Sequence, residues 1–392
     1  MNRHLLHTEI QHFIEENLHT NVSKLLLKGT SFPKVSTTEI VEQIEAKLKC
    51  KKKLPTWFST NNIYYPNKLN IEQTSSEVSA KYKSQLITGK TIADLTGGFG
   101  VDSYYFSKQF KTVDHFEINK NLSEIVTHNL KQLGVTNVHT RATDGIDYLK
   151  SQSTFYDWLY LDPSRRHDVK GKVFFLNDCE PNVPERLDDL FELSDQILIK
   201  TSPLLDISSG ISELSQVKTI HIVAVNNEVK ELLWHIENGF NGDITIKTVN
   251  LLEESHQEFS FILKEESLAN SRLDFPKSFL FEPNAAILKS GGFNSIANKF
   301  QLFKLHQHSH LYTSDDVIEF PGRSFKIESV IDYSKKSMRQ LSNTKANITI
   351  RNFPESVQQI RGKYRIKDGG ITYLFFTTNS DNKKIVIVCS KL

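Results

Sequence analysis

A run of glycines beside acidic residues is the part of the sequence best suited to holding a ligand. Residues 94–100 read Asp-Leu-Thr-Gly-Gly-Phe-Gly and follow an apolar strand start. A strand, a tight glycine turn and a helix N-terminus together form a general device for binding nucleotide-like ligands. Gly98 and Gly100 allow positive φ and a close approach of the backbone to the ligand. Glu117 ends the next strand-like run, 113–117, where an acidic residue is placed to bind a ribose diol.

The spacing of these residues differs from that of a dinucleotide-binding loop. The chain reads Asp-x-x-x-Gly-x-Gly rather than Gly-x-Gly-x-x-Gly, and a pyrophosphate needs the third glycine and the helix dipole. A sulfonium ligand with an amino-acid tail needs an acidic strand end and an open turn instead. At this point the chain resembles the class I S-adenosylmethionine-dependent methyltransferases.

Three further elements follow in the order that this family uses. Asp144 sits where the resemblance implies an acid that contacts adenine, residues 161–166 close the strand that carries the family's catalytic motif, and residues 197–200 form the next strand. The resemblance covers residues 90–264 and implies an α/β fold, a class I (Rossmann-like) sheet, with S-adenosyl-L-methionine as the cofactor. Carried over residue by residue, it implies cofactor contacts from Asp94, Thr96, Gly98, Gly100, Glu117, Ile118, Asp144 and Gly145.

Asp162 is the candidate for the chemical step, because it ends a buried strand in front of the glycine loop. A carboxylate held there can accept a hydrogen bond from the acceptor nucleophile or take its proton. Amino-group methyltransferases of this fold read Asp/Asn-Pro-Pro-Tyr/Phe, whereas this chain has Ser164 and Arg165 at the last two positions. The sequence here is closer to the Asp-Pro-Pro-Arg of RNA 5-methyluridine methyltransferases. Those enzymes need a nucleophilic cysteine after the next strand, and residues 200–204 contain none, which argues against covalent uracil chemistry.

Three basic side chains lie near Asp162 in this reading. Arg165 and Arg166 could clamp a phosphate or stack on a base, or form an ordinary salt bridge with Asp168. Lys200 ends a strand and is either a substrate contact or a surface lysine. We predict that Arg165 takes part in catalysis with Asp162, and that Arg166 and Lys200 bind substrate.

Charge is distributed unevenly along the 392 residues. Residues 89–271 hold 17 basic and 28 acidic side chains, and residues 272–392 hold 19 basic and 10 acidic ones, so the net charges are −11 and +9. Residues 1–88 carry +4. A basic module attached to an acidic core predicts a polyanionic partner such as RNA. The alternative is a solvated basic surface without a partner.

Other features exclude several classes of protein. The sequence contains no run of about 18 apolar residues, so no membrane span is predicted. The first residues lack a signal-peptide core. The three cysteines are isolated, which argues against a disulfide framework or a cysteine metal site. We therefore expect a cytoplasmic protein. The alternating trio His306, His308 and His310 could bind a metal, but an exposed polar face is the favoured reading, and no metal is predicted.

The spacing of apolar residues predicts the helices and strands that position these residues. Residues 1–88 are predicted to be helical, with a capping box at 36–39 before apolar residues at helical spacing, and Pro55 ending that helix. Residues 69–83 form a loop and short helix that could wall the active site. Residues 89–264 alternate strands and helices, as in a parallel sheet. Its strands are expected at 91–95, 113–117, 137–141, 157–162, 196–200 and 218–225, with an amphipathic helix at 227–236 and a hairpin over 244–251 and 258–263.

The rest of the chain is predicted to be an α+β region. Strands are expected at 348–353, 371–376 and 384–388, with a helix over 354–364. The domains inferred are an N-terminal helical region (1–88), a cofactor-binding methyltransferase domain (89–271), a ferredoxin-like α+β module (272–325) and a THUMP-like domain (326–392).

Taken whole, the chain resembles a family of class I methyltransferases that carry a ferredoxin-like segment and a THUMP-like domain at the C-terminus. The resemblance rests on residues 72–83, 94–102, 161–166, 226–234 and 367–374. THUMP domains bind RNA, so the resemblance implies tRNA or rRNA as the substrate, in agreement with the charge split. Within this region we predict that the basic residues Arg361, Lys363, Arg365 and Lys367 bind the substrate.

Two other functions are compatible with the sequence. One is a methyltransferase that acts on a protein or a small molecule, with the basic region serving another purpose. The other is a non-catalytic RNA-binding protein with a vestigial cofactor fold, against which the intact Gly98, Gly100, Glu117 and Asp162 count. The oligomeric state is unknown from the sequence.

Overall fold

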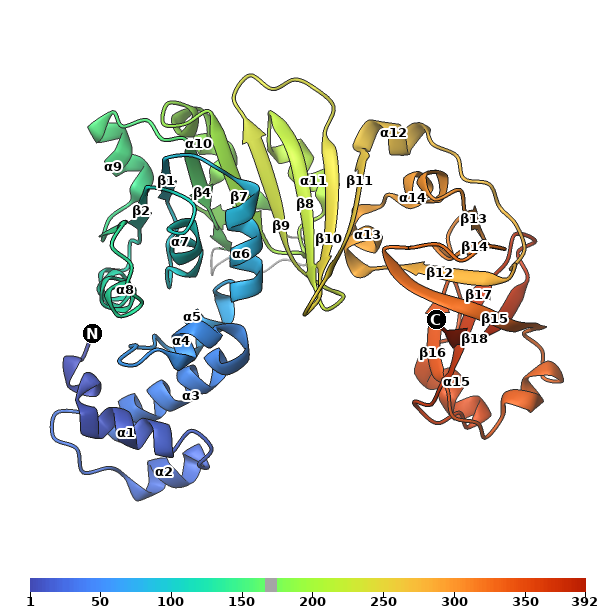
Figure 1. The fold of residues 1–392 in the computed structure, drawn as a ribbon, viewed down its shortest axis with the longest axis horizontal. Helices are drawn as coiled ribbons and strands as arrows, with labels where there is room; N and C mark the ends of the chain where they lie inside the picture. Colours follow the sequence, from blue (N-terminus) through green and yellow to red (C-terminus); the bar gives the residue numbers. More distant parts are fainter. Residues whose placement is uncertain (166–174) are drawn as a thin grey trace. The chain divides into compact units, whose positions relative to one another are not determined.

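The computed structural model describes residues 1–165 and 175–392. Their contacts divide the chain into two units, one of residues 1–218 and 233–241 and the other of residues 219–232 and 242–392. The helical, central and C-terminal regions are described below in chain order (Figure 1).

The N-terminal region is helical, as predicted. The predicted capping box is confirmed: the Glu39 amide donates to Ser36 Oγ (3.2 Å), and the Ser36 amide donates to Glu39 Oε2 (2.8 Å). The helix that it caps ends at Lys53, and Pro55 begins the next one. The region contains η1 (Arg3–Leu6), α1 (Thr8–Glu16), α2 (Val22–Lys28), α3 (Thr37–Lys53), α4 (Pro55–Ser59), α5 (Lys68–Gln73) and α6 (Glu77–Leu86).

The central region alternates strands and helices around a nine-stranded sheet. Its elements are β1 (Thr91–Asp94), α7 (Val101–Phe106), β2 (Thr112–Phe116), α8 (Lys120–Gln132), β3 (Val138–Arg141), α9 (Gly145–Gln152), β4 (Trp158–Leu161), β5 (Ser164–Arg165), η2 (Leu176–Asp178), β6 (Cys179–Glu180), α10 (Val183–Phe191), β7 (Gln196–Thr201), α11 (Ile207–Glu213), β8 (Val217–Val225), β9 (Glu228–Glu237), β10 (Thr245–Leu251), β11 (His256–Ile262) and α12 (Leu263–Leu268).

The strand order places the glycine turn after β1, which is the third strand from the β3 edge of the sheet. The order is β11-β10-β8-β9-β7-β4-β1-β2-β3, and β1 pairs in parallel with both β2 and β4. The carboxyl ends of these three strands therefore meet at one edge, where open α/β sheets bind their ligands. The six predicted strands are all present, and the predicted hairpin is the antiparallel pair β10–β11.

The helix predicted over 227–236 is wrong, because these residues form strand β9. Asn226 and Asn227 adopt φ of 49° and 63°, the conformation of a two-residue hairpin turn. Leu232, Leu233 and Ile236 are fully buried, since β9 is inserted between β7 and β8. Their spacing fits one face of a helix as well as it fits a strand buried on both faces. The two asparagines were the signal for a hairpin.

The C-terminal region is built on a seven-stranded sheet of order β13-β14-β12-β15-β18-β17-β16. Its elements are β12 (Phe279–Pro283), α13 (Ala285–Ser290), α14 (Phe293–Lys299), β13 (Phe303–Lys304), β14 (Tyr312–Ser314), β15 (Gly322–Asp332), η3 (Ser337–Leu341), β16 (Asn347–Arg351), α15 (Val357–Tyr364), β17 (Thr372–Thr378) and β18 (Lys384–Lys391). The predicted division at 325/326 falls inside β15, which pairs with both β12 and β18.

A buried ion cluster reinforces this shared sheet. Glu282 on β12 is only 3% exposed. Its carboxylate accepts hydrogen bonds from Arg323 Nε on β15 (2.8 Å) and from an Arg351 guanidinium nitrogen on β16 (2.8 Å). A buried carboxylate is stable only when it is paired in this way. The three side chains thus hold the two halves of the C-terminal region together.

Candidate functional site

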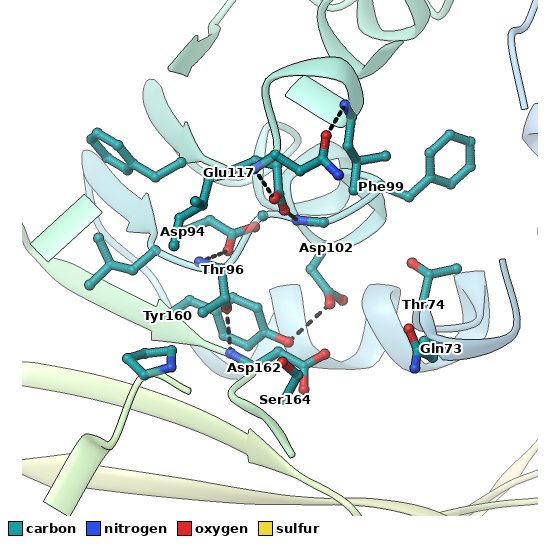
Figure 2. A pocket seen from close by; sticks show the side chains of 18 of the residues that line it. Gln73, Thr74, Asp94, Thr96, Phe99, Asp102, Glu117, Tyr160, Asp162 and Ser164 are labelled. Atoms are coloured by element: carbon teal, nitrogen blue, oxygen red, sulfur yellow. Dashed lines mark hydrogen bonds between the residues drawn. The ribbon is translucent and has the colours of Figure 1, made fainter. Parts of the chain in front are cut away.

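A cavity of about 380 Å³ opens at the carboxyl ends of β1, β2 and β4 (Figure 2). Its size is within the range of small-molecule sites in proteins. The end of α5 and the loop after it contribute Gln73, Thr74 and Ser75 to its wall, so the segment 69–83 borders the cavity. Of the residues predicted to bind cofactor, Asp94, Thr96, Gly98, Glu117, Ile118 and Asp144 line the cavity, together with Asp162.

The glycine turn holds the carboxylate of Glu117 in place. Gly98, at φ 53°, donates its amide to Glu117 Oε2 (3.0 Å), and the Asn119 amide donates to Oε1 (2.7 Å). Both oxygens are thus fixed at the mouth of the cavity. Gly97 is required for a different reason: a Cβ there would lie 2.2 Å from Nε2 of His115. Burial lowers the pKa of His115 to about 4, so this ring is a neutral support beneath the turn.

Two of the glycines predicted to bind cofactor are absent from the cavity wall. Gly100 precedes α7 as its N-cap, at φ 75°, and a Cβ on it would lie 2.7 Å from Val126 Cγ1. Gly145 is the first residue of α9, and its Cβ would lie 2.9 Å from Leu95 and from Phe116. Both positions need glycine because a side chain of the neighbouring structure lies close to the backbone there, and neither residue lines the cavity.

Asp94 lies at the base of the cavity and is 1% exposed. It accepts hydrogen bonds from Ser103 Oγ (2.6 Å) and from the Thr96 amide (3.3 Å). Burial raises the pKa of Asp94 to about 8, although the bond from Ser103 opposes this rise. A cationic group bound nearby would favour the ionised form of this carboxyl.

Asp162 follows β4 and points into the same cavity (Figure 2). Its amide donates to Thr96 Oγ1 (2.6 Å), which ties the end of β4 to the glycine turn. Its Oδ2 accepts a hydrogen bond from Lys200 Nζ on β7 at 2.5 Å. No described residue donates a hydrogen bond to Oδ1. This oxygen is therefore available to accept a hydrogen bond from a bound substrate group. Lys200 is therefore a hydrogen-bond partner of Asp162 and not an isolated surface lysine.

Of the two arginines after Asp162, the structure describes only Arg165. Arg165 lies in the short strand β5, paired with Cys179 of β6, and it is not among the residues that line the cavity. Its neighbour Ser164 does line the cavity, as does Glu180. Arg166 lies outside the described residues, so its predicted substrate contact is untested.

A buried polar network beside the cavity was not predicted. Lys83 on α6 is fully buried and forms an ion pair with Asp102 Oδ1 on α7 (2.9 Å). Asp102 Oδ2 also accepts hydrogen bonds from Ser75 Oγ (2.8 Å) and the Tyr160 hydroxyl (2.9 Å). Burial alone would raise the pKa of Asp102, but Lys83 and Lys200 outweigh it and lower this pKa. The network connects the helical region to β4 at the cavity wall, where α6 lies beside α7 (Figure 1).

The four predicted basic residues of the C-terminal region divide into two pairs. Arg361 donates to the carbonyls of Ala346 and Ile366 (3.2 Å each) and is paired with Asp368. Lys363 is paired with Glu355 at 3.0 Å and contacts the Tyr333 hydroxyl. These two residues therefore brace the fold. The other two, Arg365 and Lys367, are exposed and have no ion pair with any described residue.

The exposed polar face expected for the histidine trio is wrong for His306 and His310, which pack inside the C-terminal unit, whereas His308 is exposed. His306 is buried and makes hydrogen bonds with Asn382 and Asn352 (3.0 Å each). His310 stacks on Phe293 with ring centroids 3.5 Å apart, and burial lowers its pKa to about 4. Within residues 1–165 and 175–392, no cluster of His, Cys, Asp or Glu is arranged to hold a metal ion. No helix in those ranges is long and apolar enough to cross a membrane.

Comparisons with known proteins place the chain in a family. Residues 279–321 match the protein-family model of a ferredoxin-like domain, and residues 322–391 match that of a THUMP domain-like segment. No curated protein matches the chain by sequence. A crystal structure of a candidate methyltransferase from Porphyromonas gingivalis W83 is 32% identical, with a TM-score of 0.89, and the match covers 98% of this chain and 97% of that one.

Two more distant structures overlap only part of the chain. An rRNA methylase from Streptococcus thermophilus is 14% identical, with a TM-score of 0.30, over 41% of this chain and 93% of its own. TrmK from M. capricolum, in complex with S-adenosyl-homocysteine, is 15% identical, with a TM-score of 0.33, over 42% of this chain and 70% of its own. The assignment rests on the full-length match and the two family models. The chain belongs to the family of class I methyltransferases that carry ferredoxin-like and THUMP-like domains at the C-terminus.

Proposed function

We propose that this protein is an S-adenosylmethionine-dependent methyltransferase that acts on RNA, either tRNA or rRNA, in the cytoplasm. One observation carries the proposal: Asp94, Glu117 and Asp162 come from three adjacent strands and face one cavity. The first two suit a cationic, ribose-containing cofactor, and the third suits an acceptor that must lose a proton.

The residues of the cavity fit the cofactor. Glu117 has two oxygens fixed by backbone amides and can accept both hydroxyls of a ribose. Asp144 caps the N-terminus of α9 at the cavity wall and would lie toward the adenine. Asp94, in a buried position, would balance the positive charge of the methionine part. When bound, the cofactor would supply a methyl group activated by its positive sulfur.

Asp162 would bind the group that accepts the methyl and take its proton. The hydrogen bond from Lys200 to Oδ2 orients the carboxylate, and Oδ1 is left to accept the proton of the acceptor group. Thr96 fixes the backbone of Asp162 against the glycine turn, so the proton acceptor and the cofactor-binding residues are held in one frame. Such positioning is how a carboxylate contributes to a transfer reaction.

Replacement of Glu117 tests the cofactor site. Glu117→Ala is expected to weaken S-adenosylmethionine binding by about 1–3 kcal/mol, because charged hydrogen bonds are lost. Titration calorimetry measures this change. Glu124→Ala is the matched control, since Glu124 lies on α8 and pairs with Arg3 outside the cavity, and it should leave the affinity unchanged. Unchanged affinity in Glu117→Ala would remove this residue from the site.

Nucleoside analysis of RNA tests the substrate class. RNA from a deletion strain should lack one methylated nucleoside that mass spectrometry detects in wild-type RNA. Purified protein with methyl-labelled S-adenosylmethionine should then label RNA from the deletion strain and leave wild-type RNA, which is already modified, unlabelled. Label incorporated into protein or small molecules, with unchanged RNA nucleosides, would favour the other acceptor classes. Cofactor binding without any transfer would favour a non-catalytic protein.

A further inference from the structure

The net positive charge of the C-terminal region comes entirely from residues 322–392. Residues 272–321 hold 5 basic and 5 acidic side chains, whereas residues 322–392 hold 14 basic and 5 acidic ones, a net charge of +9. The excess therefore coincides with the THUMP-like segment at 322–391. A charge so concentrated attracts a polyanion, and the question is which part of the segment contacts it.

Several of these basic residues are already neutralised by the fold. Arg323 and Arg351 pair with Glu282, Arg361 pairs with Asp368, and Lys363 pairs with Glu355, which is the arrangement described above. Lys345 and Lys367 have no ion pair or side-chain hydrogen bond with any described residue, and both are exposed. They are thus better candidates for an anion than the two residues that brace the fold.

Lys345 and Lys367 are held side by side. Their residues form a parallel bridge between two loops, in which the Lys367 amide donates to the Thr344 carbonyl (2.9 Å) and the Ala346 amide donates to the Lys367 carbonyl (3.0 Å). Arg361 fastens the same two loops by donating to the carbonyls of Ala346 and Ile366. The two ammonium groups therefore project from a pre-formed surface.

Two glycines complete this surface. Gly369 and Gly370 have φ of 92° and 88°, a backbone conformation that side chains resist. A Cβ on Gly369 would lie 3.2 Å from Cε and 3.7 Å from Nζ of Lys345, and a Cβ on Gly370 would lie 3.2 Å from the Lys345 carbonyl. Lys345 therefore runs across both glycines. No described residue accepts a hydrogen bond from either glycine amide, so both donors remain open to a ligand.

A shallow groove of about 500 Å³ begins at this loop. Gly370, Ile371 and Tyr373 line it together with residues of β18, including Lys391, and with Glu328 of β15. Ile371 is 89% exposed although it is apolar. A polar anion site that borders an apolar and aromatic groove suits a nucleic acid strand, whose phosphates alternate with flat bases.

We propose that Lys345, Lys367 and the amides of Gly369 and Gly370 bind a backbone phosphate of the RNA, with the adjoining nucleotide lying along the groove at Ile371 and Tyr373. This inference rests on the proposed function and names the part of the chain that holds its substrate. Asp368 is the acidic group of this loop, and its pairing with Arg361 offsets part of its repulsion of a phosphate. An acidic protein segment would satisfy the lysines but would make less use of the groove.

The test compares two double variants of the full-length protein in binding to labelled bulk tRNA over a range of salt concentrations. Each phosphate contact contributes about 0.7–0.9 to the salt slope, so Lys345→Ala with Lys367→Ala should lower it by about 1.4–1.8. Lys335→Ala with Lys336→Ala removes the same charge from the exposed turn before η3 and should change the slope less. Equal effects of the two double variants would overturn the proposed site.

A variant with unchanged net charge distinguishes binding at this site from nonspecific electrostatic attraction of the RNA. Gly369→Ala should displace Lys345 and weaken tRNA binding at constant net charge, with an unchanged far-UV circular dichroism spectrum and thermal unfolding as evidence that the fold is intact. If that variant fails to fold, the lysine comparison decides alone. Competition by poly-glutamate as effective as that by tRNA would overturn the phosphate assignment in favour of an acidic protein. Wild-type protein that binds no RNA would refute the proposed function itself, whatever the variants do.

Discussion

Asp162→Asn is expected to lower methyl transfer to RNA by about 100- to 10,000-fold, the usual contribution of a positioned proton acceptor. Asparagine has nearly the same shape, so it keeps the backbone bond to Thr96 but cannot take a proton. Cofactor affinity should be unchanged, because Glu117 and Asp94 are intact. Single-turnover transfer of labelled methyl groups and calorimetry measure the two quantities separately.

The matched control lies at the opposite end of the same strand. Asp157 precedes β4 and accepts hydrogen bonds from the Thr91 amide (2.9 Å) and the Lys90 amide (2.5 Å), away from the cavity. Asp157→Asn changes the same functional group in the same strand, and it should leave transfer by the folded protein unchanged. Normal turnover by Asp162→Asn would make Asp162 a structural residue. Loss of cofactor binding in that variant would instead indicate a disturbed turn.

The sequence predicted which residues meet at this edge of the sheet because the geometry of the edge is local. A strand, a glycine turn and a helix occupy adjacent residues, so their types and order determine where Asp94 and Glu117 must lie. Gly100 and Gly145 show the limit of this reasoning. Each needs to be glycine because of a neighbour, Val126 or Phe116, that the local pattern does not reveal. A required glycine is therefore evidence of close approach, but not of approach to a ligand.

The parts that could not be predicted depend on partners distant in sequence. The apolar residues of β9 fit a helix or a strand, and only its insertion between β7 and β8 decides between them. Arg361 and Lys363 were recognised as basic, but their pairing with Asp368 and Glu355 is a property of the folded loops. The basic residue types indicated a polyanionic partner. The folded structure determines which of these side chains remain available to bind it.

The buried lysine beside the cavity leads to the largest expected effect on stability. Asp102→Ala should destabilise the unit that contains the cavity by about 3–5 kcal/mol, because it leaves a charged Lys83 buried without its partner. It also removes the acceptor of hydrogen bonds from Ser75 and Tyr160. Urea denaturation followed by tryptophan fluorescence measures this unit, since the only tryptophans, Trp57, Trp158 and Trp234, all lie within it.

A second substitution distinguishes an unpaired charge from a simple loss of packing. Lys83→Met combined with Asp102→Asn removes both charges and keeps a polar group for Ser75 and Tyr160, so this double variant should be more stable than Asp102→Ala. A buried ion pair replaced by neutral groups of similar size commonly costs little. If Asp102→Ala and the double variant were equally unstable, the lost contacts of Asp102 would explain the effect. If Asp102→Ala cost less than about 1 kcal/mol, the range of an ordinary exposed pair, Lys83 would have to be hydrated or neutral in the folded protein.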